Sequence, residues 1–219
     1  IDVEGGTLRL ENVLHAGSRA GWCVNNENAA LEIVNCTFRR IGREGLILRH
    51  CKNVVIKDCA FDEIGLTAVN ILSLGLRDTL ESGNLLVQRC EFSNSGRLQS
   101  TYTPGIYIEG CGAVVRDCSF HDIPSSGMRI EGNEIVVRDC RFMRTVTESD
   151  DQGSIDMWGN PSYRNCVFFN NYFGPVGGKG KCACGRAGIR FDDAISNQRV
   201  YGNRFENCSA GGFGGVQIH

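Results

Sequence analysis

Seven copies of a short motif, Cys-x-Phe or Asn-x-Phe, recur along this chain of 219 residues and constrain its fold more than any other feature. Counted between the phenylalanines, successive copies are 23, 31, 28, 22, 26 and 37 residues apart. A short repeat that tolerates insertions is the signature of a solenoid, in which each repeat packs only on its neighbours. The copies are Cys36-Thr37-Phe38, Cys59-Ala60-Phe61, Cys90-Glu91-Phe92, Cys118-Ser119-Phe120, Cys140-Arg141-Phe142, Cys166-Val167-Phe168 and Asn203-Arg204-Phe205.

Strand-like runs precede the copies of this motif. One run lies just upstream, as at 54–56 and 135–137, and a second run lies further upstream and opens with a small residue. Apolar and variable residues alternate in these runs, which indicates strands with one buried face, and no stretch keeps helical periodicity for ten residues. The pattern predicts an all-β fold, a right-handed parallel β-helix of about seven to eight coils. The second runs are 45–48, 68–71, 105–108, 127–130, 154–157, 188–191 and 215–218.

The six cysteines of the motif are predicted to face inward and to stack into a ladder beside a ladder of phenylalanines, with neighbouring coils about 4.8 Å apart. A thiol is small and apolar enough for this place and needs no strong hydrogen-bond partner. Ligands stacked along an axis do not converge on one point, so core packing is favoured over a metal or redox role. Cys182, Cys184 and Cys208 lie in or beside loops, where a disulfide or a weak metal site is the alternative.

Composition restricts the partners of the chain. The formal net charge is −2, the sequence pI is about 6.1, and no apolar run is long enough to cross a membrane. We therefore predict a single domain over residues 1–219 that binds neither nucleic acid nor a membrane. Strand-like residues without a polar cap begin at Ile1 and stop at His219, so we expect a solenoid truncated at both ends, whose remaining coils belong to a longer chain.

Five segments of the later coils together form one pattern, which runs from an acidic pair, a glycine and a strand through an Asn-rich turn to three further glycine-containing runs. The segments are Asp150-Asp151-Gln152-Gly153-Ser154-Ile155-Asp156-Met157-Trp158, Asn170-Asn171-Tyr172-Phe173, Gly188-Ile189-Arg190-Phe191-Asp192-Asp193, Val200-Tyr201-Gly202-Asn203-Arg204-Phe205 and Gly214-Gly215-Val216-Gln217-Ile218-His219. With these segments the chain resembles, over essentially its whole length, a subgroup of the right-handed parallel β-helix proteins of the pectate-lyase-like superfamily.

The resemblance implies the fold more strongly than the reaction. The superfamily is dominated by lyases, hydrolases and epimerases of acidic or neutral polysaccharides, so a polysaccharide or oligosaccharide is the expected partner, and many members of this subgroup have no assigned activity. The Asn-Gly-Gly-Glu type of run that marks calcium-dependent alginate and chondroitin lyases does not occur here, nor does the full set of pectin-hydrolase motifs. We expect an extracellular or periplasmic location.

The strand that opens with a small residue turns its alternate positions outward, where they are predicted to stack into two rows. Aromatic and charged residues are dense from the fourth coil onward, and a glycan groove combines such an aromatic platform with ions that bind hydroxyl, uronate or sulfate groups. An ordinary solvated face with surface ion pairs is the alternative. The first row is Ile47, Asn70, Tyr107, Arg129, Asp156, Arg190 and Gln217, and the second is Arg49, Leu72, Glu109, Glu131, Trp158, Asp192 and His219. The predicted substrate-binding residues are Tyr107, Glu109, Arg129, Glu131, Trp158, Gln217 and His219.

Three insertions, at about 93–104, 143–152 and 169–187, deliver the chain to the start of this same strand. Loops that crowd one face of a rigid scaffold tend to wall a functional cleft. The third insertion is rich in glycine and contributes Lys179 and Lys181, and we interpret it as a wall or lid, with a tolerated surface insertion as the alternative.

Hydrolysis of a glycosidic bond is the favoured reaction, because acids outnumber bases in the two rows. It needs two carboxylates that flank the bond. Asp156, Asp192 and Asp193, with Arg190 beside them, are the predicted catalytic residues, and Asp150 and Asp151 lie at a strand end nearby. Each acid also has a structural alternative, as a turn residue, a loop tip or a member of a surface ion-pair ladder.

A lyase acting on a uronate polymer is the first alternative. It needs a base and a cation that offsets the developing charge, which Arg129, Arg190, Lys179, Lys181 or His219 could supply. The acidic cluster could bind Ca²⁺ in that case, and otherwise neither a metal site nor a cofactor is predicted. A non-catalytic glycan-binding or structural solenoid is the second alternative.

Overall fold

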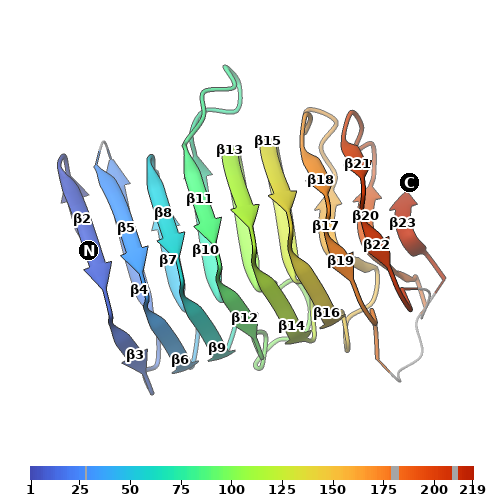
Figure 1. The fold of residues 1–219 in the computed structure, drawn as a ribbon, viewed down its shortest axis with the longest axis horizontal. Helices are drawn as coiled ribbons and strands as arrows, with labels where there is room; N and C mark the ends of the chain where they lie inside the picture. The colour runs from blue at the N-terminus through green and yellow to red at the C-terminus, as the bar shows by residue number, and fades with distance from the viewer. Residues whose placement is uncertain (28, 179–182, 209–211) are drawn as a thin grey trace.

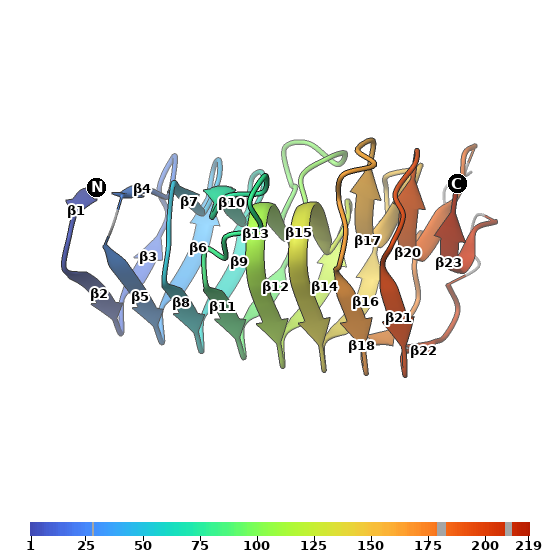
Figure 2. The same ribbon diagram turned by 90° about the horizontal axis from the view of Figure 1, so that it is seen from above.

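The chain is all-β and winds its strands into a parallel β-helix, as a computed structural model shows (Figure 1). The structure describes residues 1–27, 29–178, 183–208 and 212–219, and these residues form 23 strands and no helix. Within this part of the chain there is accordingly no helix that could span a membrane. Strands of successive coils pair in parallel and lie side by side along the axis of the solenoid (Figure 2).

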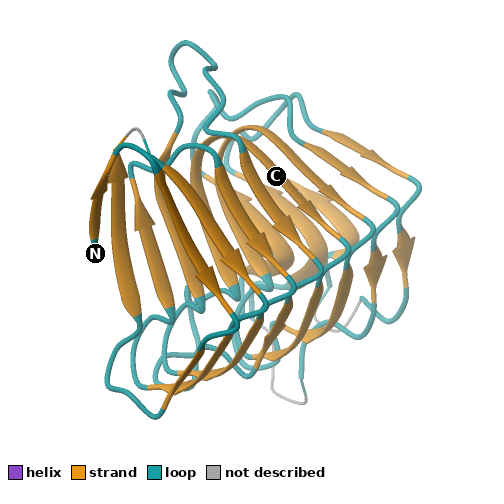
Figure 3. Cartoon of the chain, turned by 60° about the vertical axis from the view of Figure 1, so that its left-hand side comes forward, coloured by secondary structure: helices purple, strands orange, loops and turns teal. Residues whose placement is uncertain are grey.

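Each coil contributes a strand to each of three faces (Figure 3). The first face consists of β1 (Asp2–Glu4), β4 (Trp22–Glu27), β7 (Leu46–Arg49), β10 (Val69–Leu74), the first halves of β13 (Ile106–Arg116) and β15 (Met128–Arg138), β17 (Gln152–Trp158), β20 (Arg186–Asp192) and β23 (Gly214–Ile218). The second face consists of β2 (Thr7–Glu11), β5 (Ala30–Val34), β8 (Val54–Lys57), β11 (Leu85–Gln88), the second halves of β13 and β15, β18 (Val167–Phe169) and β21 (Arg199–Tyr201). The third face consists of β3 (Leu14–Ala16), β6 (Thr37–Ile41), β9 (Ala60–Ile64), β12 (Glu91–Ser93), β14 (Ser119–Ile123), β16 (Arg141–Thr145), β19 (Tyr172–Phe173) and β22 (Arg204–Phe205).

The long strands β13 and β15 run through both the first and the second face, so these two faces form one 15-stranded sheet. The third face is a separate 8-stranded sheet, to which each coil gives one strand. The described residues therefore make eight coils, and β23 adds the first strand of a ninth. The predicted parallel β-helix of seven to eight coils is confirmed.

Phenylalanines form a continuous stack under the third face. Adjacent rings lie 4.7–5.1 Å apart between centroids and are nearly parallel, at interplanar angles of 3–8°. This spacing is that of neighbouring strands, so each coil places one ring directly on the ring of the coil before it. The stacked rings are Phe38, Phe61, Phe92, Phe120, Phe142, Phe173 and Phe205.

The predicted register is wrong for one copy of the motif, Cys166-Val167-Phe168. Phe168 pairs with Val137 on the second face, and Phe173 instead continues the stack on the third. Asn171 occupies the place of the cysteine: it accepts the N–H of Cys140 at 3.0 Å and donates to the carbonyl of Val137 at 3.0 Å. An amide that forms hydrogen bonds with two backbone groups can thus replace a buried thiol. The replacement was missed because Cys166-Val167-Phe168 has the sequence of the motif without its position.

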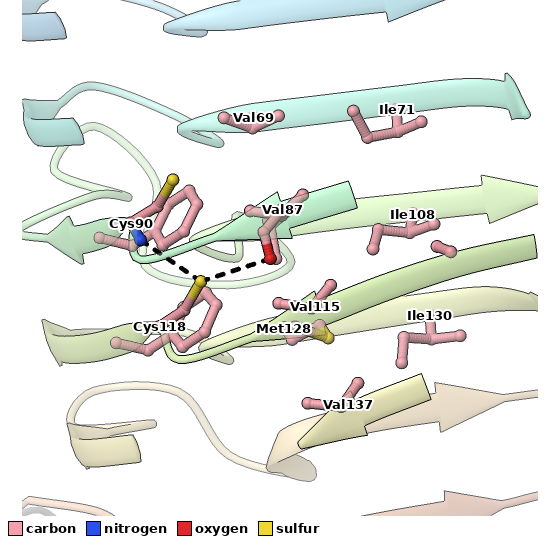
Figure 4. Close-up of a cluster of buried hydrophobic side chains, with 14 of the residues drawn as sticks. Val69, Ile71, Val87, Cys90, Ile108, Val115, Cys118, Met128, Ile130 and Val137 are labelled. Carbon is pink, nitrogen blue, oxygen red and sulfur yellow. Dashed lines mark hydrogen bonds between the residues drawn. The ribbon is translucent and has the colours of Figure 1, made fainter. Parts of the chain in front are cut away.

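The remaining motif cysteines form the predicted interior ladder. Figure 4 shows the Cys118 thiol beneath Cys90, whose N–H it accepts at 3.4 Å, and directed toward the carbonyl of Val87. Hydrogen bonding to Cys118 together with burial raises the pKa of Cys90 to about 12, so its thiol stays protonated and unreactive. Of the loop cysteines, Cys184 is an exposed free thiol and Cys208 a buried one, whereas Cys182 lies outside the described residues.

Three loops connect the third face to the first face at the later coils: residues 94–105, 146–151 and 174–185, the last of which includes undescribed positions 179–182. The predicted insertion 169–187 is interrupted by β19, so its loop begins at residue 174. Lys179 and Lys181 lie outside the described residues. These three loops bring the chain to the strands β13, β17 and β20, which together with β15 carry the candidate site.

Candidate functional site

The first predicted row lies on neighbouring strands of the first face in the expected register, whereas the second row is interrupted between β10 and β13, where the pairing shifts after Ile71. In the first row, Asn70 pairs with Tyr107, Tyr107 with Arg129, Arg129 with Asp156, Asp156 with Arg190, and Arg190 with Gln217. In the second row, Glu109 pairs with Glu131 and Trp158 with Asp192. The period of the repeat is therefore sufficient to bring side chains together that are 22 or more residues apart in the sequence.

The centre of the first row is buried, although its side chains were predicted to face solvent. Asp156 is 1% exposed and Arg190 4%, and Asp192 in the second row is 7% exposed. Trp158, at 49% exposed, remains on the surface, as does His219. The first-face strands carry these groups outward from the core. Tyr102 of the 94–105 loop lies against Arg129, and Asp151 of the 146–151 loop pairs with Arg190, which a pattern of alternation cannot reveal.

A carboxylate between two guanidinium groups forms the floor of the site. Arg129 Nη1 lies 3.1 Å from Asp156 Oδ2, and Arg190 Nη1 lies 3.4 Å from Asp156 Oδ1. The backbone N–H of Gly153 donates to the same Oδ1 at 3.2 Å. Burial raises the pKa of Asp156 above its usual value, and the two arginines oppose that rise without cancelling it. Asp156 therefore holds both arginines in place and has no surface with which to contact a substrate.

Arg129 is held in place by two carboxylates and lies beside two aromatic rings. Its Nε lies 2.9 Å from Glu131 Oε1, and its guanidinium carbon lies 5.3 Å from the ring centroid of Tyr102 and 5.9 Å from that of Trp158. Burial lowers the pKa of Arg129, but Asp156 and Glu131 outweigh this and raise it. The remaining nitrogen, Nη2, makes no hydrogen bond to any residue in the described part of the chain. It is thus free to bind an anionic group that enters between the two rings.

Tyr107 lies next to Arg129 in the first row and is half-buried. Burial raises the pKa of Tyr107, and the negative charges of Glu131 and Glu109 add to the effect. A phenol in these surroundings remains protonated at neutral pH. It can donate a hydrogen bond or a proton, but it is not a base in its resting state.

The two acids of the 146–151 loop have different roles. Asp150 accepts backbone N–H bonds from Ala183, Cys184 and Gly185 at 2.6–3.0 Å, so it ties the loop before β20 to the loop before β17. Asp151 pairs with Arg190 Nη2 at 2.6 Å, while its side chain keeps 43% of its surface exposed. Asp150 is structural, whereas Asp151 is accessible beside the buried row.

A cavity of about 480 Å³ opens above this floor. Seven of the described residues line it: Tyr102, Tyr107, Arg129, Asp151, Trp158, Arg190 and Asp192. Of the predicted substrate-binding residues, Glu109, Glu131, Gln217 and His219 do not line the cavity, although Glu131 supports Arg129. Sequence reasoning missed Tyr102, whose only signal is an aromatic residue inside an insertion expected to wall the cleft.

Asp192, Asp193 and His219 form a second group at the edge of the cavity. One ligand atom from each lies within 4.8 Å of the others, and no further such group of three occurs among the described residues. His219 Nδ1 lies 3.3 Å from Asp192 Oδ1 and 3.4 Å from Asp193 Oδ1, and Trp158 Nε1 donates to Asp193 Oδ2 at 3.0 Å. Two carboxylates and an imidazole could hold a divalent cation, and the nitrogen ligand suits Mn²⁺ or Zn²⁺ better than Ca²⁺, which prefers oxygen.

The architecture and the site define a class, a protein with the pectate-lyase-like β-helix fold and a charged, aromatic-walled cavity on its first face. The chain belongs to the family described as the right handed beta helix region, whose model matches residues 20–181 and 79–215. No curated protein matches the sequence significantly.

Solved structures of the same fold include enzymes that act on alginate. The A-modules of the Azotobacter vinelandii mannuronan C-5 epimerases AlgE6 and AlgE4 superpose with TM-scores of 0.65 and 0.61 at 13% and 12% identity. The chain is covered over 100% and 95% of its length, but it spans only 56% and 61% of those two structures. The alginate lyase from Paenibacillus sp. str. FPU-7 gives a TM-score of 0.55 at 14% identity, with 94% of this chain and 79% of the lyase covered. At these identities the likeness establishes a common fold.

Proposed function

We propose that this chain acts on an acidic polysaccharide, and that a uronate unit binds in the first-face cavity, where the proton next to its carboxylate is removed. The proposal rests on Arg129, a guanidinium group that is fixed at the cavity and whose Nη2 has no hydrogen-bond partner among the described residues. The rings of Tyr102 and Trp158 beside it offer faces on which a sugar ring can lie. The likeness to epimerases and a lyase of alginate supports a polysaccharide substrate.

Removal of the C5 proton places negative charge on the adjacent carboxylate, and a cation bound to that carboxylate stabilises the transition state. Arg129 is assigned this role. Its orientation is held by Asp156 and Glu131, so little reorganisation is needed during the reaction. Asp151, which lines the cavity, and His219 at its edge are the accessible groups that can take the proton.

Two outcomes are possible for the carbanion-like species. If the bond between C4 and the glycosidic oxygen breaks, the chain is cleaved and an unsaturated sugar forms, with Tyr107 suited to give its proton to the leaving oxygen. If a proton returns to C5 from the opposite side, the sugar is epimerised and the polymer stays intact. Both reactions begin with the same step and place the same demand on Arg129.

Hydrolysis remains a second candidate, but with a different pair of carboxylates. Asp156 is too deeply buried to contact a glycosidic bond, so the pair Asp156 and Asp192 predicted from the sequence does not suit this reaction. Asp192 and Asp193 present oxygens within 4.8 Å of each other, which is close to the separation used by retaining glycosidases. Both belong to the end of one strand, however, whereas the reaction needs carboxyl groups on both sides of the sugar.

A screen of polymers with three readouts tests the proposal. The full chain is incubated with alginate, polygalacturonate and a neutral glucan, and absorbance of unsaturated sugars, new reducing ends and deuterium uptake from D₂O are followed. Elimination gives the first two signals, epimerisation only the third, and hydrolysis only the second. Activity on the neutral glucan alone, or reducing ends without unsaturation, would overturn the proposal.

Variants separate the two possible bases. Asp151→Asn or His219→Gln is expected to lower kcat by about 10²–10⁴-fold, depending on which group takes the proton. Arg138→Gln on the second face, which removes an exposed pair with Asp139, is the control and keeps full activity. We also propose that the protein acts outside the cell or in the periplasm, because an acidic polysaccharide would be met there.

A further inference from the structure

A second cavity, of about 590 Å³, lies over the third face and shares no lining residue with the first cavity. The same two loops border both. Residues 94–97 and 147–148 line the second cavity, whereas Tyr102 and Asp151, further along these loops, line the first. The loops are joined to each other, because Ser100 Oγ donates to Glu148 Oε2 at 2.6 Å. They therefore form a common wall between two separate cavities.

The second cavity continues as a groove along the axis of the solenoid. A hollow of about 410 Å³ on the third face shares Arg39, Asp62 and Asn94 with it. Together they cover β6, β9, β12 and β14, which are consecutive strands of this face. Three steps between coils correspond to about 14 Å. A groove of this length along the axis suits an extended oligomer better than a compact ligand.

Polar groups line the groove, and two of them carry charges without a charged partner. Arg97 donates only to the backbone carbonyl of Glu63, at 3.1 Å, and Glu148 accepts only from Ser100. Neither forms an ion pair with a residue in the described ranges. The other carboxylates are paired, as Asp62 is with Arg39. A guanidinium donor and a carboxylate acceptor thus remain available in one cavity, which matches the hydroxyl group, since a hydroxyl both donates and accepts.

Charge distinguishes this groove from one that binds a uronate polymer. The second cavity contains four carboxylates and two guanidinium groups: Asp62, Glu63, Asp122, Glu148, Arg39 and Arg97. Arg40 and Arg144 pair with Glu63 and Asp122 from just outside this lining, so the charges balance and no net positive charge attracts an anionic chain. We propose that the third-face groove is a second glycan-binding site, which takes a neutral oligosaccharide segment through its hydroxyl groups. This site is independent of the reaction proposed for the first face.

Titration of the full chain by ¹⁵N–¹H NMR tests the proposal with neutral gluco- and manno-oligosaccharides and an oligouronate as separate ligands. A neutral oligomer is expected to shift the amide signals of residues 94–97 and 147–148, with a Kd of about 1 mM or lower. Arg97→Ala and Glu148→Ala should each weaken this binding about tenfold. Arg204→Ala, which removes an exposed pair with Glu206 at the last coil of the same face, should leave it unchanged.

Three results would overturn the second site: no shift at these residues with any neutral oligomer up to about 10 mM, equal binding of the oligouronate in the groove, or unaltered affinity in both variants. Folding of each variant is read from the same spectra, and Arg97→Gln and Glu148→Gln replace any alanine variant that unfolds. Shifts near Tyr102 and Arg129 on addition of oligouronate report on the first-face cavity, so the two proposals can fail separately.

Discussion

The charged row on the first face and the ion pairs on the third face both contain aspartate and arginine side chains, which are buried in the first case and exposed to solvent in the second. Asp156 is buried between Arg129 and Arg190, whereas Asp122 is paired with Arg144 in contact with solvent. Exposed pairs contribute about 0–1 kcal/mol each, and buried pairs often contribute nothing once desolvation is counted. Stability therefore does not explain the buried row. The position of the row under the cavity explains it, because Asp156 fixes two guanidinium groups where a ligand can reach them.

The largest expected effect is that of removing the buried carboxylate. Asp156→Ala should lower the free energy of unfolding by about 3–5 kcal/mol, because two buried guanidinium groups lose their counter-charge. The matched change on the third face, Asp122→Ala, should cost about 0.2–1 kcal/mol. Denaturant unfolding followed by circular dichroism measures both. Equal losses in the two variants would remove the distinction between the two regions.

A smaller effect is expected when the whole buried row is replaced. Arg129→Met, Asp156→Leu, Arg190→Met and Asp192→Asn combined should leave stability unchanged or raise it by about 1–4 kcal/mol, because Asp192 is the buried partner of Arg190 and no buried charge then remains to be desolvated. Activity on the polymer should disappear in the same protein. A combined variant that is less stable than Asp156→Ala alone would show that the row is a structural element and not one kept for the site.

The pKa values of the two carboxylates should also be shifted in opposite directions. Hydrogen bonds from Arg144 hold the pKa of Asp122 at about 2, below its ordinary 3.8, so the stability it contributes is present above about pH 4 and is lost as the pH falls toward 2. Burial raises the pKa of Asp156, so its contribution is greatest at acid pH and declines as the pH rises through its unfolded-state value toward the folded one.

Carboxyl carbon NMR shifts followed through a pH titration give the order of the two values. Asp156 should titrate above Asp122, and Arg144→Ala should move Asp122 back toward its ordinary range without affecting Asp156. An Asp156 that titrates below Asp122 would mean that the two arginines, and not burial, dominate its surroundings.

Much of the first face could be predicted from the sequence because the repeat is periodic. Once the coils are aligned, Tyr107, Arg129, Asp156 and Arg190 must fall on neighbouring strands. The alignment was wrong at Cys166-Val167-Phe168, which has the sequence of the motif but lies one strand before the position of the motif in its coil. In that coil Asn171 takes the place of the cysteine, and the spacing of the repeats does not indicate this replacement.

The depth of the site could not be predicted in the same way. Alternation shows which side of a strand a residue occupies, but not what covers that side. Asp156 was expected at the surface and is buried between Arg129 and Arg190. Tyr102 and Asp151 contact these two arginines from loops whose paths follow no period. The proposed role of Asp156 changes accordingly, from a catalytic acid to a group that positions two arginines.

The most direct measurement compares the chemistry at C5 in the unaltered chain and in Arg129→Gln, with alginate as substrate in D₂O. The unaltered chain should yield deuterium at C5 or an unsaturated uronate. Arg129→Gln should lose about 10²–10³-fold in kcat while its unfolding curve shows a folded protein. New reducing ends with neither deuterium nor unsaturation, or full activity in Arg129→Gln, would contradict the proposal.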